Sequence, residues 1–471
     1  MRWSDFPKWG TWLGDWAARY HAGLRDRPVR AQTRPGAIAA QLAEQPPEEP
    51  QPLDDVIADF ERIVMPGMTH WQHPRFFAYF PSNAAPASVL ADQIVTVMAP
   101  QCMLWQTSPA ATEMETRMMD WLRQAIALPD DFHGVIQDSA SSATLAAMLT
   151  LRERALGWQG NQEGLSGQPR LRVYASAEVH SSIDRAIWIS GIGQENLVRI
   201  PTRGPLRAMD VDALDAAIRA DLAAGFRPAG IIACTGGTGT GACDDIAATC
   251  DVAETHGLFT HVDAAWAGAA MIAPEFRPLW AGVERADSVV LNPHKWLGTQ
   301  FDLSAHYVKS PEDLTRTLAI QPEYLKTHGA DGIINYSEWS VPLGRRFRAL
   351  KLWFLIRAYG LSGLRMRIRN HVAWSEALCE RLRATPGFEI VTEPVLSLFT
   401  FRHAPEGTRD ADAHNLALVN AINDDGRIYL TQTRTGGALV IRLQAGQFDA
   451  TEDDIATAYD VITEIAATLK E

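Results

Sequence analysis

Between about residues 86 and 350, short apolar runs alternate with longer segments whose apolar residues recur at helical spacing. The clearest strand-like runs cover residues 171–174, 230–233, 258–262 and 287–291. Parallel strands need crossover connections, which helices usually supply, so this alternation is typical of a mostly parallel sheet with helices on both faces. We therefore predict an α/β domain over residues 86–350.

Two further segments flank this domain, since 471 residues are too many for a single core. In residues 1–85 an amphipathic helix is predicted by apolar residues at helical spacing: Trp3, Phe6, Trp9, Trp12, Leu13 and Trp16. Its polar face mixes acidic and basic residues, which favours packing against protein over lying on a membrane. From residue 351 a long helical pattern precedes strand-like runs at 389–391, 396–401 and 439–441, which predicts a small C-terminal α+β domain over 351–471.

The overall charge and the cysteines narrow the class of protein. A net charge of −13 argues against a general binder of nucleic acid or of anionic membranes. No apolar run reaches the length of a membrane span, and the N-terminus lacks the pattern of a signal peptide. The five cysteines are odd in number and scattered, and Cys243 and Cys250 lack a second close pair, so no metal site is expected. These features favour a cytoplasmic protein.

A lysine and an acidic residue follow two of the predicted strands. Lys295 lies in Asn292-Pro293-His294-Lys295-Trp296, after the run at 287–291, and Asp263 follows the run at 258–262. Open α/β sheets bind ligands beyond the carboxyl ends of their strands. Taken singly, a lysine in the position of Lys295 is usually just solvated, and Asp263 could be an ordinary helix N-cap. Taken together they suggest pyridoxal phosphate (PLP), whose aldehyde forms a Schiff base with a lysine and whose ring nitrogen pairs with an acid.

A turn rich in small residues joins a predicted strand and a predicted helix at residues 134–144. Ser139, Ala140 and Ser141 would present backbone N–H groups and hydroxyls at the start of that helix, where the free donors and the helix dipole favour an anion such as phosphate. The alternative is ordinary capping of the helix by serine. Asp138 fits a phosphate site poorly, because its carboxylate would repel the anion.

Two other segments follow strand-like runs. His180 comes after the run at 171–174 and would lie flat on a cofactor ring, although a lone histidine is more often structural. Glycines in the segment 235–240 would let a ligand approach the backbone closely. Each of these signals is weak by itself.

The chain resembles the group II PLP-dependent amino-acid decarboxylases, and among them most closely the aromatic-L-amino-acid decarboxylases. The motifs that carry the resemblance stand in the family's order over nearly the whole chain: 65–71 (MPGMTHW), 76–81 (FFAYFP), the segment around His180, 261–265 (HVDAA), 292–296 (NPHKW) and 342–348 (PLGRRFR). The resemblance implies the PLP-dependent transferase-like fold of type I, with residues 1–85 as a helical dimerisation arm. It also implies a homodimer whose active sites are shared between the subunits.

The resemblance assigns roles around the cofactor. Lys295 is expected to be the Schiff-base lysine and Asp263 the partner of the ring nitrogen, with His180 stacked on one face of the ring and Ala265 packed on the other. Thr238 corresponds to a threonine beside the cofactor. The phosphate is expected to be held by Ser139, Ala140, Ser141, Asn292 and His294.

The resemblance also places a catalytic tyrosine. Tyr324 matches the tyrosine of the family's mobile loop, the expected proton donor to the α carbon, with Gly329 and Gly332 as hinges of a lid that excludes water. Relatives with phenylalanine at this position tend to release an aldehyde by an oxygen-dependent route. Tyr324 therefore favours simple decarboxylation to an amine.

The substrate is expected to be an aromatic amino acid. Trp71, Tyr79, Phe80 and Pro81 match the family's aromatic pocket, although by themselves they read as core residues. Gly344 stands where indole-specific relatives often have glycine, which leaves room for a larger ring. We therefore expect tryptophan or 5-hydroxytryptophan to be favoured, with phenylalanine, tyrosine or DOPA as further candidates.

Three positions depart from the animal enzymes. Gln101 and Met103 replace an isoleucine and a phenylalanine that reach into the neighbouring subunit's pocket, and Trp266 replaces a tyrosine. The substrate preference is therefore expected to differ from theirs. The rival functions are an oxygen-dependent aromatic aldehyde synthase, a decarboxylase of a non-aromatic amino acid, an aminotransferase and a PLP-binding scaffold without turnover.

Overall fold

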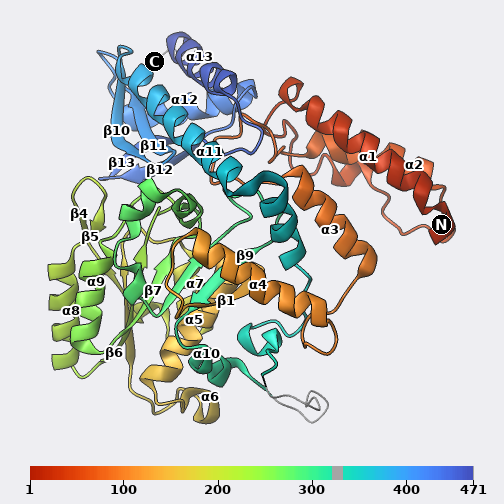
Figure 1. Ribbon diagram of the computed structural model, residues 1–471. Coiled ribbons are helices and arrows are strands. Elements are labelled where there is room, and N and C mark those ends of the chain that lie inside the picture. The colour runs from red at the N-terminus through yellow and green to blue at the C-terminus, as the bar shows by residue number, and fades with distance from the viewer. Residues whose placement is uncertain (321–331, 470–471) are drawn as a thin grey trace. The chain divides into compact units, whose positions relative to one another are not determined.

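A computed structural model describes residues 1–320 and 332–469 of the chain (Figure 1). The described residues form two compact units. The first unit comprises residues 1–81, 374–391 and 400–471, and the second comprises residues 82–373 and 392–399. The predicted division of the chain at residues 85 and 350 stays a prediction.

A seven-stranded sheet forms the centre of the second unit, with the strand order β1-β9-β8-β7-β6-β2-β3. Neighbouring strands from β8 to β3 pair in parallel, and β9 is antiparallel to both of its neighbours. The strands are β1 (His133–Gln137), β2 (Leu171–Ser176), β3 (Leu197–Ile200), β6 (Arg227–Cys234), β7 (Phe259–Asp263), β8 (Ser288–Leu291) and β9 (Ser304–Val308). The prediction of a mostly parallel sheet is confirmed.

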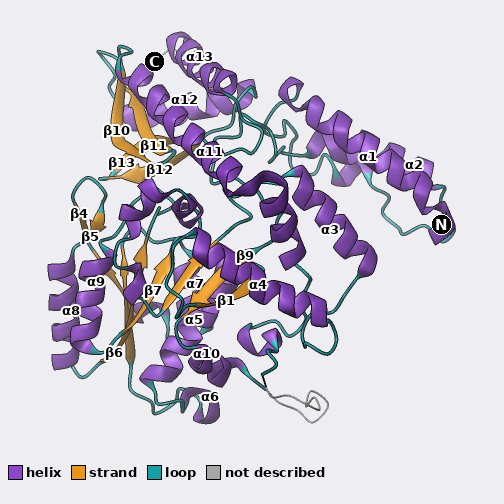
Figure 2. Ribbon diagram, in the orientation of Figure 1, coloured by secondary structure: helices purple, strands orange, loops and turns teal. Residues whose placement is uncertain are grey.

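Helices cover both faces of this sheet, which appears in orange between purple helices in Figure 2. Helix α5 crosses the sheet from β1 to β6, while α8 and α9 pack beside each other and against β6. The helices of this unit are α3 (Pro86–Met98), α4 (Pro109–Ala125), α5 (Ala140–Ala155), α6 (Gly160–Glu163), α7 (Ser182–Ile189), α8 (Val211–Ala223), α9 (Ile246–His256) and α10 (Pro311–Leu318). Every residue of β7, β8 and β9 is buried, and β8 (SVVL) accordingly reads as a continuous run of small and apolar residues.

The first unit contains the N-terminal helices and most of a small C-terminal sheet, of which residues 392–399 belong to the second unit. Its helices include α1 (Phe6–Ala22), α2 (Leu53–Asp59), α12 (Ala411–Asp425) and α13 (Glu452–Thr468), and α11 (Ala349–Arg383) contributes residues to both units. Strands β10 (Phe388–Val395), β11 (Leu398–His403), β13 (Ala438–Gln444) and β12 (Thr431–Thr435) form a four-stranded sheet in that order. Arg25 and Arg75 both bind the buried carboxylate of Asp454, at 2.7 and 3.0 Å, and so tie the N-terminal segment to α13. Within the described residues, no helix has the length and apolar character needed to cross a membrane.

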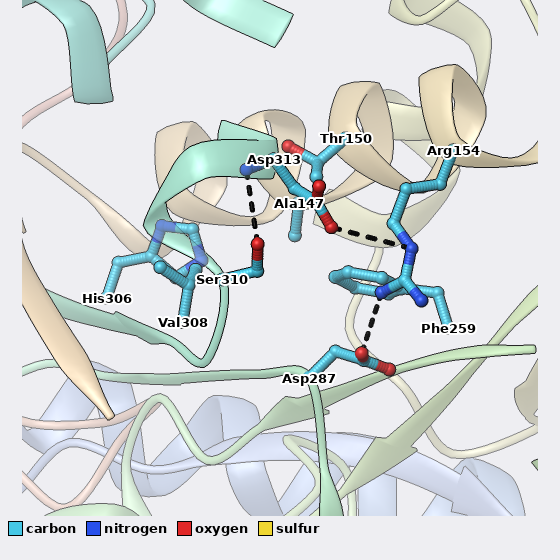
Figure 3. A pocket seen from close by; sticks show the side chains of 9 residues that line it. All are labelled: Ala147, Thr150, Arg154, Phe259, Asp287, His306, Val308, Ser310 and Asp313. Carbon is cyan, nitrogen blue, oxygen red and sulfur yellow. Dashed lines mark hydrogen bonds and ion pairs between the residues drawn. The ribbon is translucent and has the colours of Figure 1, made fainter. Parts of the chain in front are cut away.

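A chain of polar side chains lies inside the second unit, between the sheet and α5. Ser288 Oγ lies 2.9 Å from His261 Nδ1 and 2.8 Å from His306 Nε2, and none of the three residues is exposed. His306 also lines a small pocket whose opposite wall carries Arg154, bonded to Asp287 and Asp313 (Figure 3). Burial lowers the pKa of His261 to about 3 and the pKa of His306 to about 4, because a charged imidazole would lose its hydration there.

These two histidines should make the fold sensitive to acid. Both stay neutral in the folded chain, whereas in the unfolded chain they bind protons below about pH 6.5. Their contribution to stability is therefore complete above pH 6.5 and is lost as the pH falls toward 4, with a slope that approaches about 1.4 kcal/mol per pH unit for each group. Urea unfolding between pH 7 and pH 4.5 measures this slope.

The variant His306→Gln separates this effect from other titrations. Glutamine keeps a donor near the position of Nε2 and does not titrate, so we expect the slope to fall by about the contribution of one histidine. His133→Gln, at an exposed position at the start of β1, should leave the slope unchanged. An unaltered slope in His306→Gln would show that His306 is not responsible.

Candidate active site

The predicted site residues follow strands whose carboxyl ends lie at one edge of the seven-stranded sheet. Strand β1 runs parallel to β8, because both are antiparallel to β9. Ser139 follows β1, His180 follows β2, Thr238 follows β6, Asp263 ends β7 and Lys295 follows β8. This edge is where ligands bind in open α/β sheets.

The turn that carries Lys295 is held by its backbone. The Lys295 N–H donates to Asn292 O at 2.9 Å, and Asn83 Nδ2 donates to Lys295 O at 2.8 Å. The Asn292 N–H donates to Ala265 O at 2.9 Å, which links the turn after β8 to the turn after β7. These bonds fix the direction in which the lysine leaves the sheet.

Asp263 and Lys295 both act electrostatically on His180. Burial lowers the pKa of His180, the carboxylate of Asp263 raises it, and the ammonium of Lys295 lowers it again. Asp263 is 8% exposed, and its carboxylate accepts the Ala265 N–H at 3.1 Å. The structure therefore brings together the three residues that the sequence singled out most strongly.

His180 is held as one neutral tautomer. Its Nδ1 accepts the backbone N–H of Ser182 at 3.1 Å and lies 2.9 Å from the Ser182 hydroxyl. A backbone N–H can only donate, so Nδ1 carries no proton and Nε2 carries it. The exposed ring therefore presents an N–H donor on its outer side.

Ser139 is the N-cap of α5, and its side chain binds Asp138 and Ser142 there. Its Oγ accepts the Ser142 N–H at 3.2 Å and donates to Asp138 Oδ1 at 3.0 Å. The capping interpretation therefore holds for Ser139, and Ala140 and Ser141 form the first turn of the helix, where N–H groups have no partner within the helix. The Asp138 carboxylate, which lies beside the expected phosphate site, thus accepts a hydrogen bond from the Ser139 hydroxyl.

His294 also has a defined protonation state. Its Nδ1 accepts the Leu303 N–H at 3.0 Å, and burial lowers its pKa to about 3, with the ammonium of Lys295 lowering it further. The ring is therefore neutral at pH 7 and carries its proton on Nε2. A neutral N–H donor next to Asn292 suits an anionic ligand group such as phosphate.

Two of the glycines after β6, Gly236 and Gly237, are approached closely by other parts of the protein. A Cβ on Gly236 would lie 2.5 Å from Ala267 Cβ and 3.0 Å from the Trp266 ring, and one on Gly237 would lie 3.0 Å from Glu178 O. The Trp266 ring in turn stacks on Trp296 with centroids 4.9 Å apart. The close approach that the sequence suggested for a ligand is made at Gly236 and Gly237 by other parts of the chain.

The residues expected to bind the substrate belong to two units. In the first unit Trp71 stacks on Tyr79 with ring centroids 5.9 Å apart and an angle of 21°. Phe80, which precedes the buried Pro81, lies 4.7 Å below the guanidinium of Arg442. The aromatic residues of the motif at 76–81 thus form contacts with one another and with the C-terminal sheet of the same unit.

In the second unit Gln101 and Gly344 are neighbours. Gln101 Oε1 accepts the Arg345 N–H at 2.8 Å, and a Cβ on Gly344 would lie 3.4 Å from Gln101 Nε2. The backbone carbonyl of Met103 accepts the Ser337 N–H at 3.1 Å. Arg345 itself is buried in an ion pair with Glu115 at 2.6 Å. The segments around residues 101 and 344 are therefore fixed to each other.

Two of the sequence predictions concern the loop at 321–331. Tyr324 and Gly329 lie outside the described residues, and Gly332, the second expected hinge, has a positive φ of 85°. The role of Tyr324 stays a prediction, as do the catalytic roles assigned to the other site residues.

Several residues at this edge were missed by the sequence analysis. Asn83 binds the turn of Lys295, and the hydroxyl of Ser304 donates to Asn292 Oδ1. Lys351, which is only 1% exposed, binds the loop that follows the turn. For Lys351, the sequence does offer one indication: it is a basic residue inside the otherwise apolar helical stretch 349–356.

The residues at this edge fit PLP. They supply a lysine at the end of a buried strand, a carboxylate on the neighbouring strand, an exposed neutral imidazole and a helix N-terminus with a second neutral imidazole. A carboxylate is suited to a cationic ring nitrogen, and neutral N–H donors are suited to a phosphate. This donor set is assembled from four segments of the chain, which follow β1, β2, β7 and β8.

Comparison with known proteins agrees with this chemistry. Residues 35–404 match the family model described as pyridoxal-dependent decarboxylase conserved domain. The chain is 39% identical to aromatic-L-amino-acid decarboxylase from Sus scrofa over 100% of this chain and 98% of that protein. It is 36% identical to phenylacetaldehyde synthase from Arabidopsis thaliana over 98% of this chain and 96% of that protein.

A solved structure shows the same architecture. The crystal structure of Oryza sativa TDC with PLP and tryptamine matches with a TM-score of 0.96 and 34% identity, covering 99% of this chain and 98% of that chain. The fold and the cofactor expected from the sequence are thereby confirmed. The chain belongs to the family of PLP-dependent decarboxylases.

Proposed function

We propose that this enzyme decarboxylates an aromatic L-amino acid to the corresponding arylalkylamine and CO2. Tryptophan or 5-hydroxytryptophan is the favoured substrate, and phenylalanine, tyrosine and DOPA are the other candidates. The observation that carries the proposal is the placement of His180, Asp263 and Lys295 at the carboxyl ends of β2, β7 and β8, on one edge of the sheet. The names of the relatives support an aromatic substrate.

Each of these residues has a distinct task in the proposal. Bound PLP supplies a ring that accepts the electron pair left on the α carbon when CO2 departs. Lys295 would hold the cofactor covalently through its ε-amino group. Asp263 would keep a proton on the ring nitrogen, and His180, neutral with its proton on Nε2, would stack on the ring and donate to the substrate carboxylate. Ser139, Ala140, Ser141, Asn292 and His294 hold the phosphate, with Thr238 and Ala265 beside the ring.

The aromatic preference rests on the apolar residues expected in the pocket. Trp71 and Tyr79 already form a stacked pair, and such surfaces bind flat rings through apolar burial and stacking. Gly344 adds space, because the nearest atom to a Cβ there is Gln101 Nε2 at 3.4 Å, at the end of a flexible side chain. A bicyclic indole benefits most from that space.

One rival function has support from specific relatives. Phenylacetaldehyde synthase of Arabidopsis thaliana and 4-hydroxyphenylacetaldehyde synthase of Rhodiola rosea both resemble this chain over nearly its whole length. Tyr324 is the residue that we expect to separate the two reactions, since it donates the proton that completes an amine. With Tyr324 present, decarboxylation to the amine is the favoured outcome.

We also propose that the enzyme acts as a cytoplasmic homodimer. Helix α1 has no buried residue, although it carries Trp9, Trp12 and Trp16, and Trp3 just before it is 70% exposed. A second copy of the chain would cover this apolar surface. All five cysteines are buried and free, which is compatible with a reducing compartment.

A panel of amino acids tests the proposal. The purified enzyme with PLP is incubated with tryptophan, 5-hydroxytryptophan, DOPA, tyrosine, phenylalanine, histidine and glutamate, and CO2, amine, aldehyde and hydrogen peroxide are measured. We expect one amine per CO2, no peroxide, and a kcat/KM for the indole substrates about ten-fold above that for phenylalanine, because the larger ring buries more apolar area. Hydrogen peroxide and ammonia formed in molar amounts equal to CO2 would establish the aldehyde synthase instead. Release of CO2 from glutamate and from none of the aromatic amino acids would refute the aromatic pocket.

A further inference from the structure

A buried lysine forms hydrogen bonds to the loop that follows the turn carrying Lys295. Lys351, near the start of α11, is 1% exposed, and its Nζ donates to Asp302 O at 2.8 Å and to both Gln300 O and Gln300 Oε1 at 3.1 Å. Two of these three acceptors are backbone carbonyls. A side chain that binds main-chain oxygens fixes the path of the backbone whatever side chains the loop carries.

The loop bound by Lys351 leads directly into Leu303, which hydrogen-bonds to the His294 ring. Leu303, directly after Asp302, donates its N–H to His294 Nδ1 at 3.0 Å. That bond sets the tautomer of His294, the ring that neighbours Lys295. The carbonyls at 300 and 302 and the imidazole at 294 thus belong to one continuous set of contacts.

Residues at the start of α3 form further hydrogen bonds to the same loop. Ser88 Oγ accepts the Gln300 N–H at 2.7 Å, and the Ala85 N–H donates to Gly298 O at 2.9 Å. Both residues lie a few positions beyond Asn83, which binds Lys295 O. The loop is therefore clamped between the start of α3 and the start of α11.

The charge of Lys351 is maintained by nearby carboxylates. Asp92 lies 3.6 Å from its Nζ, and Asp302 is the other acid close to it. Burial lowers the pKa of Lys351 to about 8, while Asp92 and Asp302 raise it, so the group is mostly an ammonium at pH 7. Removing a cation from water is costly, and here the carbonyls and the two carboxylates offset that cost.

We propose that Lys351 is a positioning residue for the cofactor, which fixes the turn carrying His294 and Lys295 by binding the backbone of residues 300–302. It touches neither the substrate nor the reacting atoms. The inference rests on the proposed roles of Lys295 and His294 in holding PLP. It adds Lys351, about 50 positions further along the chain than the turn of Lys295, to the residues on which cofactor binding depends.

The variant Lys351→Met tests the proposal, because methionine has a similar length without the ammonium. We expect the Kd for PLP to rise at least ten-fold, together with a change in the visible absorbance of the lysine-bound cofactor. Ser88→Ala releases the same loop from the other side and should raise the Kd in the same direction. Lys309→Met, which removes a lysine paired with the exposed Asp131 at 3.6 Å, should leave the Kd unchanged.

A general loss of stability must be separated from misplacement of the turn. Arg152→Met removes another buried cation that binds a backbone carbonyl, at Ser190 O, near the opposite end of α5 from Ser139. It should lower the unfolding midpoint of the apoenzyme without raising the Kd for PLP. The proposal is overturned if Lys351→Met binds PLP as tightly as the wild type, or if the Kd in Lys351→Met, Ser88→Ala and Arg152→Met simply follows their loss of stability.

The test is independent of the reaction that the enzyme catalyses. If the wild type binds PLP but decarboxylates no aromatic amino acid, the proposed function fails, while the effect of Lys351→Met on the Kd is still measurable. If aromatic amines form but the Kd is unchanged in Lys351→Met and in Ser88→Ala, only the role of Lys351 is refuted.

Discussion

Replacing Lys295 by alanine is expected to lower the decarboxylation rate about 10³-fold or more, in the range seen when a covalent catalytic group is removed. The loss follows from position: Lys295 is the one lysine in the turn after β8, and Asn83 and Asn292 fix its backbone beside Asp263. No neighbouring group can take over a covalent bond that depends on this geometry. Steady-state amine formation with excess PLP gives the rate.

The same variant should lose the visible absorbance of lysine-bound PLP while still binding the cofactor, since the phosphate contacts come from other segments. Borohydride reduction followed by peptide mapping then assigns the site in the wild type, and we expect the label on Lys295 alone. Lys309→Met, with its lysine directly after the end of β9, serves as the control and should keep both absorbance and rate. A label on another lysine, or a Lys295→Ala enzyme with near-normal turnover, would refute the assignment.

The part of the site that could be predicted from the sequence is the part that follows strands. Asp263 and Lys295 each come directly after a run of buried residues, and parallel strands place their carboxyl ends at one edge. Adjacency of such residues is therefore implied by local patterns alone. The helix N-terminus at Ser139 is predictable for the same reason, because a small-residue turn precedes a helical run.

The supporting contacts could not be predicted, because they join segments that are distant in sequence. Asn83 reaches Lys295 across 212 positions, and Arg345 reaches Glu115 across 230. Neither residue sits in a periodic pattern, and nothing local marks it as paired. The glycines after β6 illustrate a related limit: the sequence indicated a close approach to the backbone, but only the structure shows that the approaching groups at Gly236 are Trp266 and Ala267.

The protonation states are a further property that only the structure supplies. His180 and His294 are both neutral with the proton on Nε2, but for reasons that lie in other residues, the backbone N–H groups of Ser182 and Leu303. The sequence pattern around each histidine does not show which backbone N–H group will bind its ring. Two imidazoles with defined tautomers make the expected phosphate and carboxylate contacts specific in direction.

Replacing Asp263 by asparagine is expected to be nearly as damaging as loss of Lys295. A carboxylate about 4 Å from the ring nitrogen of bound PLP stabilises the protonated ring by on the order of 4 kcal/mol at an effective dielectric constant near 20. Asparagine removes that charge and keeps the shape, so we expect the rate of CO2 release to fall about 10³-fold. Single-turnover CO2 release measures this step without interference from product release.

Two comparisons show whether the charge itself is responsible. Asp287→Asn changes another carboxylate of the same sheet, one that binds the Thr260 N–H at the opposite ends of β7 and β8, and it should alter the rate little. Asp263→Asn should also lower the pKa of His180 further, because the Asp263 carboxylate raises it in the native chain. An Asp263→Asn enzyme within ten-fold of the wild type would mean that the ring nitrogen needs no negative partner, and that the pairing of β7 with β8 serves only to place Lys295.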